Sequence, residues 1–358
     1  MGCVNQVLIL ILISLSALFF STSTAQSFKC STPGICSALV GYAPRNATSI
    51  SAILNLFNIK NLRNVLGANG LPLNTTRNFT VEAKQTIKIP ISCLCSNGTG
   101  VVYNGPVYTV KKDDGLFIIA SEVFSGLVVY EKIQQANKIP NANLIDVGQN
   151  LTIPLPCSCD DVDGDKVVHY AHVVQSESSL ESIAKQFGTD EDTLKKINDI
   201  ADDSKLIADQ AIDVPLKACN SSIKSESLDN GLRVANGTYV FTANGCVKCT
   251  CDSASSPLQC EQSQLQLPSS KWQTCPAMQC EGSESLSIGN FTTNGCNRTT
   301  CSYAGYTNQT ILRTIDTSTT CSNPSTDPSN IASRIGSSWS FLFISSIHLI
   351  PLFLRLFH

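Results

Sequence analysis

Three related stretches decide the fold: QTIKIPISCLC (Gln85–Cys95), QNLTIPLPCSC (Gln149–Cys159) and QAIDVPLKAC (Gln210–Cys219). Each is a short apolar strand that reaches a proline, and a cysteine follows within four residues. A unit that recurs about every 60 residues predicts one small module used three times. An array of this kind, cross-linked by cysteines, is more typical of a binding protein than of a single active site.

The middle copy shows the order of elements within a module. Val107–Val110 alternates like a strand, Leu116–Phe124 and Val128–Ala136 have helical spacing, and Leu151–Ile153 alternates again. The third copy repeats this plan at shifts of 64 and 61 residues. The first copy matches at its end, but it has no clear first strand before Ile50. The sequence therefore predicts an α+β protein built from three βααβ modules.

A second duplication follows the third module, where the composition changes to Ser, Asn, Gly and Thr. FTANGCVKCTC (Phe241–Cys251) and FTTNGCNRTTC (Phe291–Cys301) match at a shift of 50 residues. Their Asn-Gly pairs predict tight hairpins. We therefore expect a small, disulfide-rich β region.

Both ends of the chain resemble processing signals. An apolar run, Val7–Phe20, precedes a small residue at Ala25, as in a secretory signal peptide. A second apolar run, Trp339–Phe357, is interrupted by polar residues and follows a small-residue stretch, which favours a GPI-attachment signal with Asn330 as acceptor over a spanning helix. The predicted boundaries are 1–25 signal peptide, 26–95 first module with an N-terminal cysteine segment, 105–156 second module, 168–217 third module, 219–321 cysteine-rich β region, 322–330 stalk and 331–358 GPI-attachment propeptide.

Cysteine and sequon usage agree with export. Of 17 cysteines, Cys3 lies in the signal peptide, which leaves an even number for disulfides. Cysteines two apart are strained partners, so excluding those pairs leaves ten connectivities for the first six, and all of them join modules to one another or to the N-terminal segment. We therefore expect one compact body. The predicted N-glycosylation sites are Asn46, Asn74, Asn78, Asn97, Asn150, Asn220, Asn236, Asn290, Asn297 and Asn308.

Several functions are disfavoured by the sequence. A net charge of −3 argues against nucleic acid as the main ligand. The acidic run Asp160–Asp165 does not fit a calcium loop and is interpreted as a solvated linker. His169 and His172 lack zinc spacing, and Cys246, Cys249 and Cys251 are expected to form disulfides. No carboxylate pair stands in a catalytic context, so we expect no enzyme, no metal and no cofactor.

The repeat order, the Cys-x-Cys spacers and the segment Ala136–Gln149, which fits AN-x-I-P-x-x-N-x-I-x-V-G-Q, closely resemble plant LysM receptor-like proteins of the GPI-anchored, chitin elicitor-binding type. The resemblance implies three disulfides: Cys30–Cys95, Cys36–Cys159 and Cys93–Cys157. It also implies a sugar groove between two loops of the middle module. The residues carried over are Asp113, Asp114, Gly115, Leu116 and Phe117 from one loop and Ile139, Pro140, Asn141, Ala142 and Asn143 from the other.

Such a groove suits an uncharged sugar chain. Acetamido groups offer one donor, one acceptor and a methyl, so main-chain polar groups with a few apolar contacts suffice. Gly115 would let the backbone approach the sugar, and Leu116 or Ile139 would contact methyl groups. The alternative for Asp113 and Asp114 is a turn or helix-capping role, and the alternative for Ile139 and Pro140 is a place in the core and in a turn. The third module differs at Ser178 and Ser179, so we expect the site in the middle module alone.

The implied function is a cell-surface receptor for chitin oligosaccharides in plant immunity. A GPI anchor leaves nothing in the cytoplasm, so signalling would need a partner LysM receptor kinase, and one ligand could bridge a homodimer. Two alternatives remain open: a peptidoglycan-binding receptor of the same architecture, and a structural glycoprotein of the cell wall.

Overall fold

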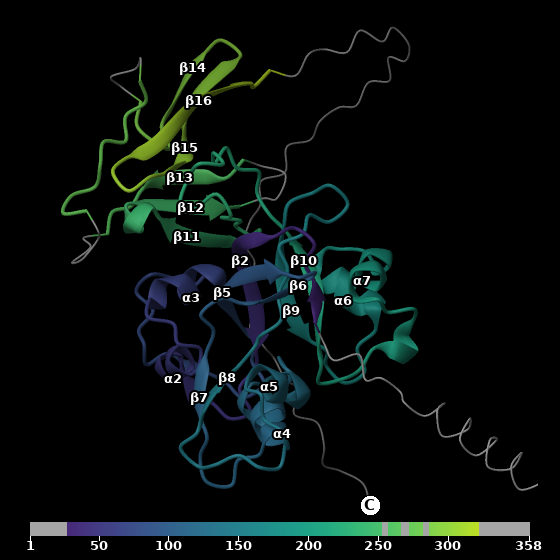
Figure 1. The fold of residues 1–358 in the computed structure, drawn as a ribbon. Coiled ribbons are helices and arrows are strands. Elements are labelled where there is room, and N and C mark those ends of the chain that lie inside the picture. The colour runs from purple at the N-terminus through teal and green to yellow at the C-terminus, as the bar shows by residue number, and fades with distance from the viewer. Residues whose placement is uncertain (1–26, 253–256, 266–271, 282–285, 322–358) are drawn as a thin grey trace, which may run out of the picture. The chain divides into compact units, whose positions relative to one another are not determined.

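The computed structural model describes residues 27–252, 257–265, 272–281 and 286–321. The predicted signal peptide, stalk, acceptor Asn330 and GPI propeptide lie outside these residues. Residues up to Thr320 form one compact unit, which is shown in Figure 1. Its mixture of short helices and strands, braced by disulfides, confirms the predicted α+β class.

The middle module has the predicted βααβ order. β7 (Val107–Thr109) pairs antiparallel with β8 (Asn150–Thr152). Between them, α4 (Leu116–Ile118) continues into the π-helical turn η2 (Ile119–Val123), and α5 (Tyr130–Ala136) follows. Leu116, Ile119 and Ile133 are almost fully buried, because the helical spacing turns them onto the strand pair.

The third module repeats this order with longer elements. It consists of β9 (Val167–Val173), α6 (Leu180–Phe187), α7 (Glu191–Asn198), a short 3-10 turn η3 (Asp203–Lys205) and β10 (Ala211–Lys217). Leu180, Ile183 and Leu194 are buried at the positions that the periodicity predicts.

The first module has a first strand after all, so that part of the prediction was wrong. β2 (Gly34–Tyr42) pairs with β5 (Ile87–Ser96) on either side of α2 (Ile50–Leu56) and α3 (Leu62–Ala68). Most of β2 is buried on both faces and its sequence does not alternate, which hid it. An additional short pair, β3 (Thr48–Ser49) with β4 (Thr80–Val81), precedes and follows the helices.

The first and third modules share one sheet. Its strand order is β1-β6-β5-β2-β9-β10, where β1 is Phe28–Lys29 and β6 is Thr99–Val102. β2 and β9 are parallel, with Leu39 opposite Tyr170. The middle module joins through the core, since the rings of Phe57 and Phe124 meet edge to face at 5.8 Å. The modules therefore form one body within the described residues, as the cysteine arithmetic suggested.

One asparagine performs the same task in each module. The side chain of Asn137 accepts a hydrogen bond from Thr152 N and donates to Thr152 O and Ile133 O, each at 2.8 Å. Asn69 makes the equivalent bonds in the first module and Asn198 in the third. Each asparagine thus joins the end of the second helix to the returning strand and satisfies main-chain groups that the helix end leaves unpaired.

Disulfides brace the array. The structure pairs Cys30 with Cys95, Cys36 with Cys159 and Cys93 with Cys157, which are the pairings that the resemblance implied. All six cysteines are buried together under the sheet. The bridges close loops of 65, 123 and 64 residues, which restricts the unfolded chain.

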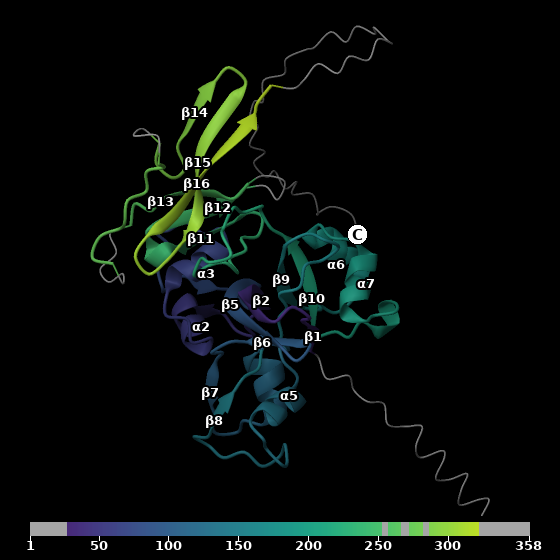
Figure 2. The ribbon, with the colours of Figure 1, turned by 45° about the horizontal axis from the view of Figure 1, so that its top comes forward.

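The cysteine-rich region forms two three-stranded sheets (Figure 2). The first contains β11 (Thr238–Thr242), β12 (Val247–Cys251) and β13 (Gln259–Gln262), and the second contains β14 (Phe291–Asn294), β15 (Asn297–Tyr306) and β16 (Ile311–Thr319). Each copy of the duplicated motif forms the first hairpin of its sheet. Disulfides in this region include Cys219–Cys251, Cys246–Cys275, Cys249–Cys260 and Cys280–Cys301.

Candidate functional site

The two predicted ligand loops leave the same end of the middle module. Thr109 ends β7 opposite Asn150, where β8 begins. Val110 N donates to Gln149 O at 2.9 Å, and Gly148 N donates to Val110 O at 2.8 Å. The first loop (residues 111–117) and the second loop (residues 137–148) therefore start from one hydrogen-bonded base, and we call the surface that they form the middle rim.

Asp114 shapes the first loop. Its carboxylate accepts hydrogen bonds from Tyr108 Oη at 2.8 Å and from Lys111 N at 2.7 Å. Burial and the Asp114 carboxylate together raise the pKa of Tyr108. Asp113 is exposed in the left-handed region at φ 69°. Gly115 begins α4 without a side-chain cap, and no heavy atom lies within 4 Å of the position that a Cβ would take. Asp114 is thus a turn-forming residue, and the main chain at Gly115 is open.

Leu116 and Ile139 do not line the surface, which corrects the expected methyl contacts. Leu116 is 1% exposed and Ile139 is 7% exposed, because both belong to the core. The apolar side chains that the two loops do expose are Phe117 at 68%, Leu144 at 69% and Val147 at 70%. The sequence interpretation missed Leu144 and Val147. Apolar residues in an otherwise polar loop could have indicated exposed apolar side chains there.

The second loop is shaped by its own polar groups. Asn141 Oδ1 accepts from Asn143 N at 3.0 Å, and Asn141 O accepts from Leu144 N at 2.9 Å. Gln134 Nε2 donates to Ile139 O at 3.0 Å. Pro140, Asn141 and Asn143 are exposed, whereas Ala142 packs against the core.

The three modules differ in how their two loops are joined. In the first module Ile50 N donates to Phe79 O and Ser51 N to Arg77 O, both at 2.9 Å. In the third module Leu180 N donates to Asp203 Oδ1 at 2.8 Å. No hydrogen bond joins residues 113–117 to residues 139–143, all of which the structure describes. The middle rim is therefore open where the flanking rims are closed.

Helix capping follows the same division. Side chains of Ser49 and Asn61 cap α2 and α3, and those of Ser179 and Asp190 cap α6 and α7. Neither α4 nor α5 has a side-chain cap. In the flanking modules the chain itself satisfies its helix starts, which leaves less for a ligand to bind.

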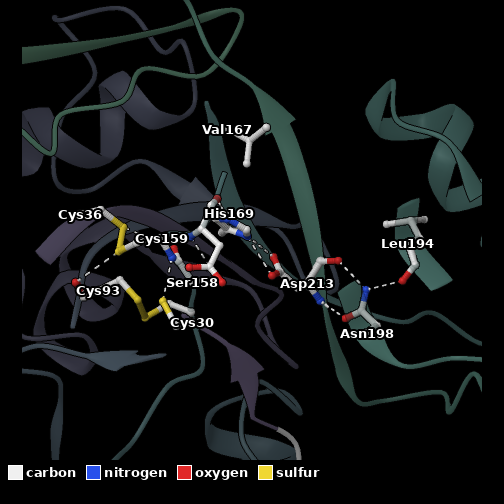
Figure 3. Close-up of polar contacts among 12 residues, drawn as sticks. Cys30, Cys36, Cys93, Ser158, Cys159, Val167, His169, Leu194, Asn198 and Asp213 are labelled. Carbon is white, nitrogen blue, oxygen red and sulfur yellow. Dashed lines mark hydrogen bonds and ion pairs between the residues drawn. A yellow bond between two sulfur atoms is a disulfide. The ribbon is translucent and has the colours of Figure 1, made fainter. Parts of the chain in front are cut away.

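A buried polar network supports the third module rather than forming a site. His169 Nδ1 lies 2.8 Å from Asp213 Oδ2, and its Nε2 lies 2.7 Å from Asp160 O (Figure 3). Burial would lower the pKa of His169, but the Asp213 carboxylate and the hydrogen bonds outweigh it, so that the pKa is raised. His172 lies beside Phe187, and burial lowers its pKa to about 4.

The acidic run is not a solvated linker, which corrects the prediction. The Asp160 carboxylate accepts hydrogen bonds from Ser31 N and Thr32 N at 2.8 to 2.9 Å. These bonds outweigh its partial burial and lower its pKa. Asp161 pairs with Arg233 at 2.8 Å, and Asp163 pairs with Lys196 at 2.6 Å. The run therefore connects the N-terminal segment, the third module and the cysteine-rich region.

Other concave or clustered features lie away from the middle rim. Cavities of about 150 and 220 Å³ both include Leu232 and Arg233 and are lined by the flanking modules and the cysteine-rich region. The Sγ atoms of Cys30, Cys93, Cys95 and Cys159 lie within 4.8 Å of one another, but all four belong to disulfides and offer no thiolate to a metal. The asparagines of all ten predicted glycosylation sites are exposed, including Asn150 beside the middle rim.

Three βααβ units with Cys-x-Cys spacers define a repeat array braced by disulfides. The family model for the LysM domain matches residues 108–154 and 172–215. The chain is 50% identical over 341 residues to LysM domain-containing GPI-anchored protein 2 of Arabidopsis thaliana, covering 93% of this chain and 94% of that protein. It is 38% identical over 333 residues to the chitin elicitor-binding protein of Oryza sativa subsp. japonica, covering 90% of each.

The chain therefore belongs to the plant family of LysM domain-containing GPI-anchored proteins. Among solved structures, the ectodomain of a receptor-like kinase is 24% identical with a TM-score of 0.43, covering 52% of this chain and 92% of that chain. In the part of the chain that the structure describes, no helix is both long and apolar enough to cross a membrane.

Proposed function

We propose that this protein is a cell-surface receptor that binds N-acetylglucosamine oligomers at the middle rim. The observation that carries the proposal is the absence of hydrogen bonds between the two loops of the middle module, among described residues, where both flanking modules have them. An open rim leaves main-chain donors and acceptors for the acetamido groups of a neutral sugar.

The apolar side chains of the middle rim supply the second half of the site. Phe117, Leu144 and Val147 are each about two-thirds exposed or more, and they lie on the two loops that flank the opening. An aromatic ring can stack on the apolar face of a pyranose, and aliphatic side chains can contact acetamido methyl groups. Asp114 and Asn141 hold the loops in shape, so their role is positioning.

The proposal includes the way in which binding reaches the cell. A GPI lipid holds the receptor on the outer face of the membrane and provides no cytoplasmic part, so a partner with a kinase domain relays the signal. One oligomer long enough to touch two receptors gains affinity from the higher effective concentration of the second site. Support comes from family membership and from the relative that carries the name chitin elicitor-binding protein.

Calorimetric titration with N-acetylglucosamine oligomers of increasing length tests the proposal. We expect affinity to rise with length until the middle rim is filled. Phe117→Ala should weaken binding at each length because it removes an exposed ring, and Asp114→Ala should weaken it by releasing the first loop. Binding that is lost in Phe117→Ala but kept in a correctly folded first-module variant supports the middle rim. Absence of binding at every length overturns the proposal, and preferential binding of peptidoglycan fragments in competition would redirect it to that polymer.

A further inference from the structure

The flanking modules carry opposite charge. Residues 27–96 contain seven lysines and arginines and one acidic residue, whereas residues 167–217 contain ten acidic residues and five lysines. Residues 107–155, which contain the middle rim, are nearly balanced, with five acidic and four basic residues. A chain with a small net charge thus contains a basic module, a nearly neutral module and an acidic module in that order.

Part of the charge on each flanking module forms no ion pair among the residues that the structure describes. In the first module the exposed Arg77 donates to Lys60 O at 3.1 Å, and neither Lys60 nor Arg77 forms an ion pair among the described residues. Arg45 and Lys29 are already paired, with Glu122 and Asp199. We call Lys60 and Arg77 the basic face.

In the third module three exposed acids lie beside the closed rim without an ion pair among the described residues. Hydrogen bonds from Ser204, and then the charges of Lys205 and Lys195, lower the pKa of one of them, Asp202. Glu177 precedes α6 and Glu181 lies in its first turn, and both are exposed. The bond from Leu180 N to Asp203 sets the loop that contains Asp202 beside them. Glu191 and Asp163 are already paired with Lys195 and Lys196. We call Glu177, Glu181 and Asp202 the acidic face.

The shared sheet sets the two faces on either side of the middle module. Because β2 and β9 are parallel neighbours, the chain leaves both of these strands at the same end of the sheet, which we call the shared edge. The middle module lies across this edge: Ser125 Oγ donates to Ala43 O at 2.7 Å, and a Cβ on Gly126 would lie 2.1 Å from Asp209 O. In both Figure 1 and Figure 2, α2 and α3 lie on one side and α6 and α7 on the other, with α5 below and between them.

From this arrangement we infer that the flanking modules are a pairing surface for a second copy of the chain, with the basic face of one copy against the acidic face of the other. Because β2 and β9 are neighbours in the shared sheet, the basic and acidic modules lie side by side. Such a pair is self-complementary under a two-fold axis between two copies, because the rotation sets each charged module opposite its complement, and two such contacts form at once. The inference rests on the proposed receptor function for its purpose, since it names the surface on which two receptors meet.

Charge complementarity of this kind mainly sets partner choice, orientation and association rate. The contact would be weak in the absence of ligand, because exposed ion pairs contribute little individually and are screened by salt. Weak pairing suits a receptor that must remain mostly unpaired until an oligomer adds its own binding energy.

A charge-swap experiment tests the pairing on the purified full chain by analytical ultracentrifugation. Lys60→Glu with Arg77→Glu reverses the charge of the basic face, and Glu177→Lys with Glu181→Lys leaves the acidic face with a net positive charge. We expect each double variant alone to self-associate at least about tenfold more weakly than the wild type, and an equal mixture of the two to recover wild-type affinity to within about threefold. Raising NaCl from about 50 mM to about 500 mM should weaken the wild-type dimer at least about tenfold.

Two controls keep the test decisive. Lys166→Glu with Lys224→Glu changes the net charge by the same amount at exposed lysines outside the basic face and should leave self-association unchanged. Lys60→Gln with Arg77→Gln removes the charge without reversing it and should give an intermediate loss. A wild type that stays monomeric at every salt concentration, with and without an N-acetylglucosamine oligomer, or a mixture that does not recover association, overturns the pairing.

The same samples separate this inference from the proposed function. Calorimetry with the oligomer should give wild-type sugar affinity per site in both charge-swapped variants, since the middle rim is unchanged. Intact sugar binding without charge-dependent pairing contradicts the pairing surface alone. Charge-dependent pairing without sugar binding contradicts the receptor proposal alone.

Discussion

The middle module and its two neighbours share the same βααβ arrangement but differ in how the two loops of each module are joined. In all three modules an asparagine joins the second helix to the returning strand, which we call the asparagine clamp, and equivalent helix positions are buried. In the first module main-chain bonds close the rim, and in the third the Asp203 carboxylate closes it. The middle rim has neither and exposes Phe117, Leu144 and Val147 instead. If the middle rim binds sugar as proposed, binding capacity in this array depends on whether the loops use their polar groups for each other, and not on the repeat itself.

The largest expected effect concerns acid, and it separates the third module from the middle one. Burial lowers the pKa of His172 to about 4, so the unfolded chain binds more protons than the folded chain between that value and about 6.5. Stability from this group is therefore lost as pH falls through that window, by roughly 3 kcal/mol at pH 4. His172→Phe should remove most of this acid sensitivity in thermal unfolding at pH 7 and pH 4.

His169 provides a control of opposite sign. Its raised pKa stabilises the fold at pH values below about 6.5, and that contribution is lost as pH rises through the folded-state pKa. His169→Gln should therefore flatten the alkaline side of the stability profile and leave the acid side. A His172→Phe variant that is as acid-sensitive as the wild type would contradict the assignment.

The next prediction concerns the asparagine that joins the second helix to the returning strand in each module. Asn137→Ala removes three hydrogen bonds of 2.8 Å and leaves Thr152 N and Thr152 O without their side-chain partner, whereas Ile133 O keeps its bond from Asn137 N. We expect a loss of roughly 2 to 3 kcal/mol in the free energy of unfolding, measured by denaturant titration. Asn69→Ala and Asn198→Ala should cost similar amounts. A loss confined to one of the three would show that the clamp is not a common element.

A smaller effect tests the sugar surface of the middle rim. Phe117→Ala removes a largely exposed ring that makes one aromatic contact, to Tyr130 at 6.5 Å, so folding should change little. Affinity for an N-acetylglucosamine oligomer should fall by about 1 to 2 kcal/mol, roughly five- to thirtyfold, in calorimetry. The matched variant is Phe79→Ala, since Phe79 is 41% exposed on the closed rim of the first module. Equal losses in the two variants would contradict a site restricted to the middle module.

The smallest expected effect comes from a substitution that should open the closed rim of the third module. Asp203→Ala removes the acceptor for Leu180 N, which should cost about 1 kcal/mol, as the loss of a helix cap does. Amide exchange at Leu180 should accelerate, and Asp203→Asn, which retains an acceptor oxygen, should remain close to the wild type. Unchanged exchange in Asp203→Ala would show that the bond does not hold the third rim closed.

Much of the fold could be predicted because its signals are local and repeated. The spacing of Leu116 and Ile119 matches Leu180 and Ile183 at a shift of 64 residues, and all four are buried. The recurrence of Asn137 as Asn198 marked a common position, although only the structure revealed its clamping bonds. The possible cysteine pairings predicted one compact body held by disulfides, and the Asn-Gly pairs predicted hairpins.

The remainder depends on contacts between distant residues. The parallel pairing of β2 with β9 joins residues about 130 positions apart and leaves no periodic signal. Leu116 and Ile139 were placed both in the core and at the ligand surface by sequence reasoning, and only packing shows that the core takes them. The bond from Leu180 to Asp203 spans 23 residues, so the closed rim could not be read from either loop alone.

Hydrogen–deuterium exchange of the full chain, with and without a saturating N-acetylglucosamine oligomer, tests the difference between the rims most directly. We predict that protection increases at residues 113–117 and 139–147 and stays unchanged at residues 49–51, 77–79, 177–181 and 200–204. Protection that appears at a flanking rim instead, or no protection at the middle rim at saturation, would contradict it.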